Sequence, residues 1–314
     1  MRHPLPLGPG ERWAGLATLC YALTNTFLRA TIDPAHPPDP VVAAIVRLLP
    51  VTALAWTLTF VTRGKATLRP GSARFAGWRV LAAILLSGAA SYFIGNSAYQ
   101  SALNQGGVNV TIPVAQSASL WSGILLGGAF LGEHFDLRVA WGGLAVMIGL
   151  VLITTGRAFD PRPDWYLAIP FGAVAGASYA TANLFMRSAY RRGVAQSSGL
   201  ALNTLSGLTL LLATAIARDG IAFIARLTPS ALATLFVAGI FNAGALFSLS
   251  RALTLTTAGR VNTINTGSLA ISTLLAALLF NELMTPPIAL GIALIVGGVL
   301  LVQRFLHPAS PQTA

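Results

Sequence analysis

Long apolar segments constrain the fold of this chain more than any other feature of its sequence. Ten windows of predominantly apolar residues follow one another with only short connections between them. A helix needs about 20 such residues to span the hydrocarbon core of a bilayer. The alternation of apolar and polar residues that marks barrel strands is absent from the sequence. We therefore expect an all-α integral membrane protein with ten transmembrane helices. The windows are 13–32, 41–62, 77–99, 109–131, 139–156, 165–186, 198–217, 231–250, 260–280 and 286–303.

The composition indicates that lipid is the solvent of these segments. Of the 314 residues, 54% are hydrophobic and only 9% are charged, whereas soluble domains average about 25% charged residues. A soluble protein with so few charges could not cover its surface. Residues 1–10 are rich in Pro and Gly rather than apolar, so we expect no cleavable signal peptide and direct insertion of the first helix.

The distribution of basic residues along the chain fits a membrane topology. A net charge of +11 would suit nucleic-acid binding, but the basic residues are unevenly placed. With a cytoplasmic N-terminus and ten crossings, fourteen of the 20 Lys and Arg residues fall in cytoplasmic segments and five in outer segments, while Arg47 lies inside a helix. This asymmetry matches the positive-inside rule. It predicts a multi-pass protein of the cell inner (plasma) membrane, with both termini cytoplasmic and no nucleic-acid partner.

The sequence contains an internal repeat. The segments YALTNTFLRA (21–30) and YATANLFMRS (179–188) share the pattern Tyr-Ala-x-x-Asn-x-Phe-x-Arg. Further matches follow in chain order along the later helices, which makes chance similarity a poor explanation. The aligned pairs are Arg47 with Asn203, Tyr92 with Asn242, Gln116 with Asn265, Ser119 with Ser268, Glu133 with Glu282, Gly142 with Gly291, and Gly149 with Gly298.

Each copy of the repeat holds five predicted helices, so the second copy must enter the membrane in the opposite sense. Two inverted halves give a transporter two states that open to opposite sides of the membrane, with the substrate site near the midplane. The repeat therefore favours a secondary transporter that works by alternating access.

Three segments resemble the drug/metabolite transporter superfamily, specifically its EamA-like members. They are DPVVAAIVRLLPVTAL (39–54) at the start of the second helix, and LLGGAFLGEHF (125–135) and LLAALLFNELM (274–284) at the ends of the fourth and ninth helices. Asn281 stands where this family usually has Gly, and Pro113 lies near the start of its helix rather than near the middle.

The resemblance implies two EamA-like five-helix repeats, at 1–156 and 165–306, followed by a short cytoplasmic tail at 307–314. It also implies movement of small polar or amphipathic metabolites, amino acids or drugs among them, and most often outward. It does not choose among these substrates.

Polar side chains within the helices are the candidates for a substrate cavity. Such groups are costly in lipid and usually face the interior of a helix bundle. Tyr and Asn recur four residues apart, which places them on one helix face. The candidates are Tyr21, Asn25, Arg47, Tyr92, Asn96, Gln116, Ser119, Tyr179, Asn183, Asn203, Asn242, Asn265 and Ser268. The same groups could instead form interhelical hydrogen bonds that only hold the helices together.

Three charged residues have two interpretations each. Arg47 either meets an anionic group of the substrate or bonds backbone carbonyls as a structural residue. Glu133 and Glu282 end the fourth and ninth helices, where they are either gates or structural caps. No Asp or Glu lies deep in a predicted helix, and proton-coupled pumps usually need a titratable chain there. Facilitated diffusion or exchange is therefore favoured over proton coupling.

Glycines recur seven residues apart on the fifth and tenth helices, at Gly142 and Gly149 and at Gly291 and Gly298. Each pair marks a smooth helix face suited to close packing. These helices are therefore expected to act as scaffold or as the contact of a homodimer.

An enzyme is the rival class, and the sequence argues against it. The four His residues lie in tails or loops, no cluster has metal-ligand spacing, and no phosphate-binding loop is present. We expect no catalytic residues, metal or cofactor. The expected partners are a small-molecule substrate and the lipid bilayer. A lipid-carrier flippase or a membrane sensor of the same fold is the alternative function.

Overall fold

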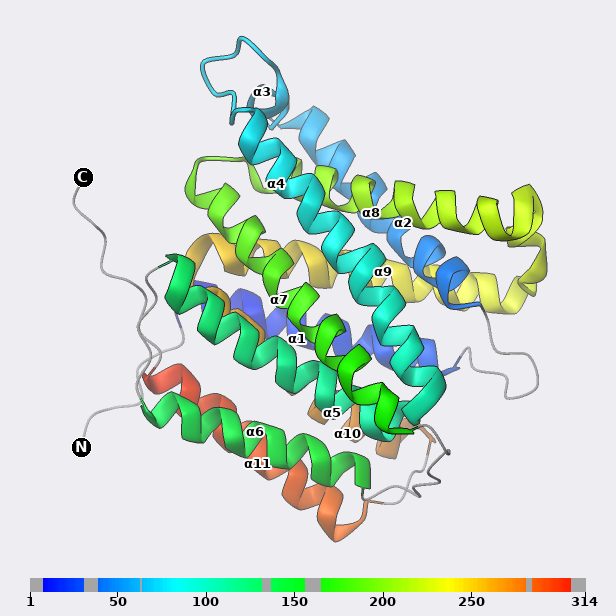
Figure 1. Cartoon of the computed structure of the whole chain (residues 1–314), viewed down its shortest axis with the longest axis vertical. Coiled ribbons are helices and arrows are strands. Elements are labelled where there is room, and N and C mark those ends of the chain that lie inside the picture. The colour runs from blue at the N-terminus through cyan, green and yellow to red at the C-terminus, as the bar shows by residue number, and fades with distance from the viewer. Residues whose placement is uncertain are drawn as a thin grey trace.

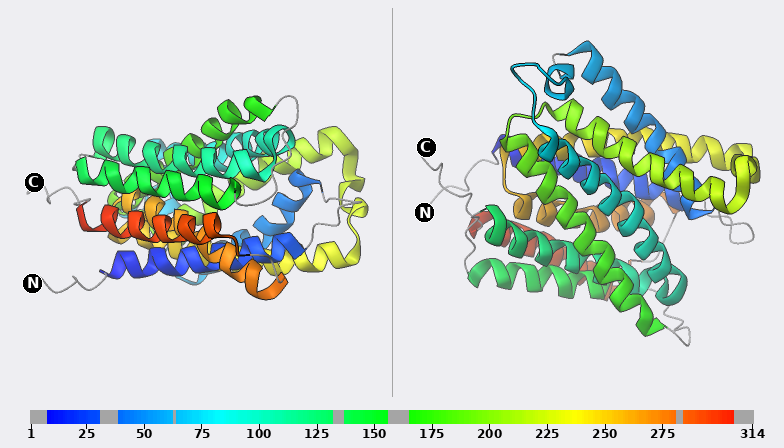
Figure 2. Two further views of the ribbon diagram at one scale, coloured as in Figure 1. Left: turned by 90° about the horizontal axis from the view of Figure 1, so that it is seen from below. Right: turned by 45° about the horizontal axis from the view of Figure 1, so that its top comes forward.

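The computed structural model describes residues 8–30, 39–62, 64–131, 137–155, 165–280 and 284–305. Every regular element in these ranges is helical (Figure 1). The elements are α1 (Pro9–Ala30), α2 (Pro40–Val61), α3 (Lys65–Leu68), α4 (Trp78–Gly88), the π-helix η1 (Ala89–Gly95), α5 (Asn96–Leu131), α6 (Leu137–Thr155), the 3₁₀-helix η2 (Trp165–Leu167), α7 (Ala168–Arg191), α8 (Gln196–Asp219), the 3₁₀-helix η3 (Gly220–Arg226), α9 (Pro229–Leu255), α10 (Ala258–Phe280) and α11 (Pro286–Phe305). Helix α1 begins and α11 ends at the same end of the bundle (Figure 2), which we call the terminal end.

Seven helices of the described ranges are long and apolar enough to span a membrane. They are Val41–Val61, Trp78–Tyr99, Val110–Phe130, Leu137–Thr155, Gln196–Phe223, Pro229–Leu255 and Ala258–Leu279. Helix α11 contributes a shorter apolar helix, Pro286–Val302. Helices α1 and α7 have 22 and 24 residues, but they are less apolar because they carry the repeated Tyr, Asn and Arg residues. The chain is thus a multi-pass membrane protein, and the total of ten transmembrane helices stays a prediction.

Local sequence signals fix several helix ends. The Asp39 carboxylate accepts hydrogen bonds from the backbone N–H groups of Val41 (2.9 Å) and Val42 (3.1 Å), and so caps the N-terminus of α2. Gly193 follows α7 and Gly220 follows α8, with φ angles of 84° and 68°. Glycine adopts this left-handed conformation without the strain that a Cβ atom would add.

The third and fourth predicted helices are joined by helical residues. Elements α4, η1 and α5 follow one another without a break. In Figure 1 the ribbon descends through α4 and returns through the later part of α5. The π-helix η1 widens the turns in the middle of this path, and such segments are rare and frequently found at functional sites.

Helices α6 and α11 pack through the glycines that the sequence marked as smooth faces. A Cβ atom added at Gly149 would lie 2.6 Å from the Gly291 carbonyl oxygen, and one added at Gly298 would lie 2.5 Å from the Gly142 carbonyl oxygen. The helices therefore touch backbone to backbone, which small residues allow. These faces cover each other within one chain, so they are not available as the contact of a homodimer.

Two further glycines mark where helices of the two halves cross. A Cβ atom at Gly239 of α9 would lie 3.0 Å from the Arg47 carbonyl oxygen of α2, and one at Gly88 of α4 would clash with the Asn203 carbonyl oxygen of α8. Because Arg47 and Asn203 are aligned in the repeat, the second helix of each half crosses the third helix of the other half at an equivalent residue. A two-fold axis between the halves would produce this reciprocal pattern.

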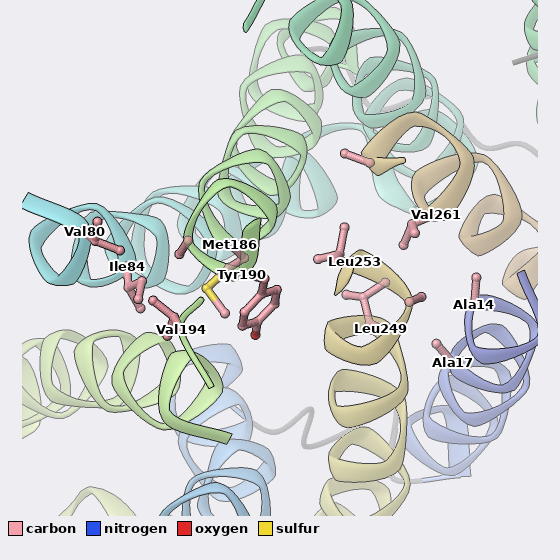
Figure 3. Close-up of a cluster of buried hydrophobic side chains, with 13 residues drawn as sticks. Ala14, Ala17, Val80, Ile84, Met186, Tyr190, Val194, Leu249, Leu253 and Val261 are labelled. Carbon is pink, nitrogen blue, oxygen red and sulfur yellow. The ribbon is translucent and has the colours of Figure 1, made fainter. Parts of the chain in front are cut away.

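A buried apolar cluster joins helices of both halves (Figure 3). Met186 and Tyr190 of α7 lie between Ile84 of α4 and Leu249 of α9. Tyr21 of α1 is partly buried against this cluster. Tyr21 of the repeated motif therefore packs against a buried apolar cluster to which both halves contribute.

Candidate functional site

Arg47 of α2 is a half-buried cation without a charged partner. Its Nε atom is fully buried and makes no hydrogen bond. Within the described ranges, no carboxylate forms an ion pair with it. The phenols of Tyr179, Tyr99 and Tyr21 lie within electrostatic range of the guanidinium. These four residues belong to helices α1, α2, α5 and α7. We call Arg47 and the three tyrosines the Arg47 cluster.

Tyr179 of the cluster is held by the end of the π-helix. Its hydroxyl donates a hydrogen bond to Asn96 Oδ1 at 2.9 Å. Its ring lies on Gly95, where an added Cβ atom would come within 2.7 Å of Tyr179 Cε1. Gly95 is the last residue of η1 and Asn96 the first residue of α5. The π-helix thus ends at the two residues that support and orient Tyr179.

Asn183 lies one turn further along α7 and pairs with α10. Its Nδ2 donates a hydrogen bond to Asn262 Oδ1 at 2.7 Å. Asn262 is buried, its own Nδ2 lacks a hydrogen-bond partner, and its side chain lies against Gly123 of α5. Asn262 was not among the residues predicted from the sequence, because the aligned residue of the first half is Pro113, which is not polar.

Tyr99 is the other member of the site that the sequence analysis missed. It follows Asn96 by three residues on α5, so the two side chains occupy neighbouring positions on one side of the helix. The aligned residue of the second half is Leu249. Helical spacing could have identified Tyr99, whereas comparison of the two repeats could not.

Three predicted site residues lie in contacts between helices. Asn203 of α8 is buried, and its Nδ2 donates a hydrogen bond to Ser87 Oγ of α4. Tyr92 lies in a buried apolar cluster, and its ring presses against Gly207. Asn242 of α9 is buried as well. These surroundings fit the interpretation that polar groups hold membrane helices together.

The remaining predicted residues are distributed over α1, α5 and α10. Gln116 and Ser119 of α5 are half-buried, and Asn25 of α1 is exposed. Asn265 of α10 is half-buried, and its Oδ1 atom is buried without a hydrogen-bond partner. Ser268 is buried one turn further along α10. The structure does not join these five residues to the Arg47 cluster by hydrogen bonds, and their role in a cavity stays a prediction.

Comparison with known proteins identifies the family. The model of the EamA-like transporter family matches the sequence twice, at residues 8–155 and 166–304. The chain belongs to the EamA-like transporter family. This confirms the predicted resemblance to the EamA-like members of the drug/metabolite transporter superfamily. One crystal structure is similar over 94% of this chain and 96% of its own, with a TM-score of 0.74 and 18% sequence identity, which shows a shared fold. No curated protein matches the sequence significantly.

In this EamA-like transporter, ion pairs connect the two halves near opposite ends of α1. Where α1 begins, Glu11 Oε1 lies 2.6 Å from Arg260 Nη1 and accepts a hydrogen bond from Thr256 Oγ1 at 3.1 Å. Beyond the other end of α1, Asp39 Oδ2 lies 2.7 Å from Arg218 Nη2. Each pair joins a residue of the first half to a residue of the second half.

The charge of Glu11 is stabilised despite its burial. Burial alone would raise the pKa of this carboxyl group, but hydrogen bonds from its own backbone N–H, from Arg260 and from Thr256 hold the pKa below its usual value. Glu11 is therefore ionised when it meets Arg260. The two glutamates predicted as gates, Glu133 and Glu282, lie outside the described residues.

One cavity of the described residues lies away from the Arg47 cluster. It has a volume of about 650 Å³ and opens between the end of α2, the loop after α3 and the turn from α7 to α8. Its lining includes Arg74 and Arg192, and none of the predicted site residues lines it. This cavity is therefore distinct from the predicted substrate cavity.

Proposed function

We propose that this chain is a secondary transporter that moves small polar or amphipathic metabolites outward across the inner membrane by alternating access. The observation that carries the proposal is Arg47, a half-buried cation whose buried Nε atom has no partner and which has phenols of both halves within electrostatic range. An ionisable residue within a membrane protein is expensive and usually marks a substrate or ion pathway.

Arg47 differs in charge from the polar groups that bond one another between helices. Asn203 bonds Ser87 in such a contact. In the Arg47 cluster, by contrast, the buried Nε atom has no partner. A partner that arrives from outside the chain is the simplest way to satisfy this donor.

Ten transmembrane helices in two inverted halves are part of the proposal. The beginning of α1 and the end of α11 lie at the same end of the bundle (Figure 2), as an even number of crossings requires. We place this terminal end in the cytoplasm because the basic residues gather in the segments assigned to that side. The reciprocal glycine contacts between the halves support a two-fold axis in the membrane plane.

The two ion pairs near the ends of α1 are contacts between the halves that can break one at a time. Glu11 and Arg260 hold the halves together at the terminal end, while Asp39 and Arg218 do so beyond the other end of α1. Alternating access needs one end to open while the other stays closed. We propose that opening toward either side breaks the ion pair at that side. The outward direction of net transport follows the family resemblance.

The function is tested by comparing small molecules in the medium of cells. One culture expresses the intact chain, and a second expresses the Tyr179→Ala/Asn183→Ala double variant at an equal level in the membrane. Both replaced residues belong to the polar contacts of α7 with α5 and α10. We expect a few small compounds to accumulate outside only with the intact chain.

Tyr166→Ala is the matched control, because Tyr166 is an exposed tyrosine outside the site. It should export the same compounds as the intact chain. If the media of all strains contain the same compounds as the medium of cells that do not express the chain, metabolite export is contradicted. A lipid-flipping assay on the same membranes would then test the alternative function.

A further inference from the structure

We propose that Arg47 selects organic monoanions, in particular carboxylates attached to a flat apolar body, as the substrates of this transporter. The proposal rests on the proposed function and names the chemical class that the Arg47 cluster would recognise.

The free edge of the guanidinium suits a carboxylate. Arginine and carboxylate groups often pair through two parallel N–H···O bonds, and Nε with one Nη nitrogen offers such a pair of donors. In Arg47 the Nε donor is unbonded, while the side chain as a whole remains partly accessible. One carboxylate would satisfy the orphaned donor and neutralise the buried charge together.

The carboxylates of the described residues have partners other than Arg47. The structure describes three carboxylate side chains, those of Glu11, Asp39 and Asp219, and each pairs with Arg260 or Arg218. The phenols around Arg47 are neutral at physiological pH. The described part of the cluster therefore carries one positive charge, and one negative charge on a ligand balances it.

An amino acid would fit this site less well than a simple carboxylate. Its ammonium group would need an acceptor of negative charge, and no described carboxylate belongs to the cluster. Burying such a group without a partner is costly. We therefore expect the cluster to discriminate against zwitterions as well as against neutral molecules.

The tyrosines favour a flat apolar group next to the carboxylate of the substrate. Tyr21, Tyr99 and Tyr179 lie within electrostatic range of the cation and belong to three different helices. Aromatic rings contribute apolar contact area and favour stacked or edge-to-face partners. The Tyr179 hydroxyl already donates to Asn96 and its ring lies on Gly95, so the part of the ring that points away from Gly95 is what remains for a ligand. A flat apolar body next to the carboxylate matches this lining.

A monoanionic substrate also supplies a driving force. Arg47 is part of the protein and does not cross the membrane, so each transport cycle moves the charge of the substrate alone. A potential that is negative inside favours a monoanion outside by roughly 50-fold per 100 mV. Export would then need no coupled proton, which agrees with the absence of acidic residues deep in the predicted helices.

Binding to the purified full chain in detergent tests the selectivity. The probes are phenylacetate, its neutral amide phenylacetamide, and phenylalanine, each titrated by calorimetry. We expect phenylacetate to bind at least tenfold more tightly than the other two probes, and Arg47→Gln to remove that difference. Arg47→Lys should keep part of it, because it restores the charge without the planar fork.

Arg69→Gln is the matched control, because Arg69 is exposed and lies outside the cluster. It should bind all three probes like the unmodified chain. Equal binding of the acid and the amide would overturn the proposal. An equal loss of all three probes in Arg47→Gln, or no binding of phenylacetate at millimolar concentration, would also overturn it.

Transport in proteoliposomes separates this proposal from the proposed function. Benzenesulfonate is a suitable probe because its fixed charge keeps it from crossing lipid unaided. Movement of benzenesulfonate by the unmodified chain, reduced at least tenfold in Arg47→Gln, would support both proposals. Binding without movement would contradict transport and leave the anion site standing. Movement of phenylacetamide in preference to benzenesulfonate would contradict the anion site and would still support transport.

Discussion

At the scale of single residues, Arg47 is expected to reduce stability in return for function. A half-buried cation with a buried, unbonded Nε loses part of its hydration without a full set of partners. Replacing it with Gln removes the charge and keeps a polar side chain of similar reach. We therefore expect Arg47→Gln to raise the stability of the ligand-free protein by an amount on the order of 1 kcal/mol, measured as the thermal unfolding temperature in detergent. A clear fall in that temperature would mean that Arg47 is a structural residue.

The pair formed by Glu11 and Arg260 makes stability depend on pH. The pKa of Glu11 is held below its usual value of 4.5, so the folded state favours the ionised form. Its contribution is fully present above pH 4.5 and is lost as the pH falls through the lower pKa of the folded state. At neutral pH we expect Glu11→Gln to lose about 1–3 kcal/mol, because Arg260 keeps its charge while the group that it bonds at this position loses its negative charge.

Unfolding temperatures of the unmodified chain and of Glu11→Gln, followed from neutral to acidic pH, check this expectation. The difference between the two proteins should shrink as the pH falls from 4.5 through the folded-state pKa of Glu11. A difference that stays constant over the whole range would show that ionisation of Glu11 does not stabilise the fold.

The sequence predicted part of the site at this scale. Arg47, Tyr21 and Tyr179 could be identified because a charge or a repeated tyrosine inside an apolar helix is conspicuous. Tyr99 and Asn262 could not be found from the repeat, since Leu249 and Pro113 occupy the aligned positions. The partner of a polar side chain depends on how helices cross, and spacing along one helix does not contain that information.

At the scale of helices, the contact of α6 with α11 depends on residues without side chains. A Cβ atom at Gly298 would lie 2.5 Å from the Gly142 carbonyl oxygen and 2.8 Å from Val146 Cγ2. Its neighbour Gly297 has nothing within 4 Å. We expect Gly298→Ala to force the helices apart and to lower stability by about 1–3 kcal/mol, seen as a lower thermal unfolding temperature.

Gly297→Ala is the matched control on the same helix. It adds a methyl group where there is space, and alanine favours the helical conformation more than glycine does. The control should therefore be neutral or slightly stabilising. Equal losses in Gly297→Ala and Gly298→Ala would show that the close contact is not what holds α6 to α11.

The apolar windows predicted most of the helices, but they did not predict the details that shape the site. Length and hydropathy identified the membrane segments, and glycine spacing identified the smooth faces of α6 and α11. The π-helix η1 and the helical connection through α5 have no clear sequence signal, because both depend on packing against neighbouring helices. The glycine faces were also compatible with a homodimer until the structure placed α6 against α11.

At the scale of the whole molecule, the two halves resemble each other without being identical. Tyr179 bonds Asn96 in the structure, whereas the aligned residues are Tyr21 and the apolar Leu246. The hydrogen bonds of α7 therefore lack a counterpart on α1. Under the alternating access proposed above, we expect the two states to differ in energy and the contacts of α7 to stabilise the conformation described here.

Transport of benzenesulfonate across proteoliposomes under an imposed membrane potential tests the central claim most directly. We expect the unmodified chain to move the anion toward the positive side, and Arg47→Gln to reduce the initial rate at least tenfold at equal protein density. Arg69→Gln should match the unmodified chain. Movement that is insensitive to the potential, or equally fast in Arg47→Gln, would contradict a transporter in which Arg47 selects monoanions.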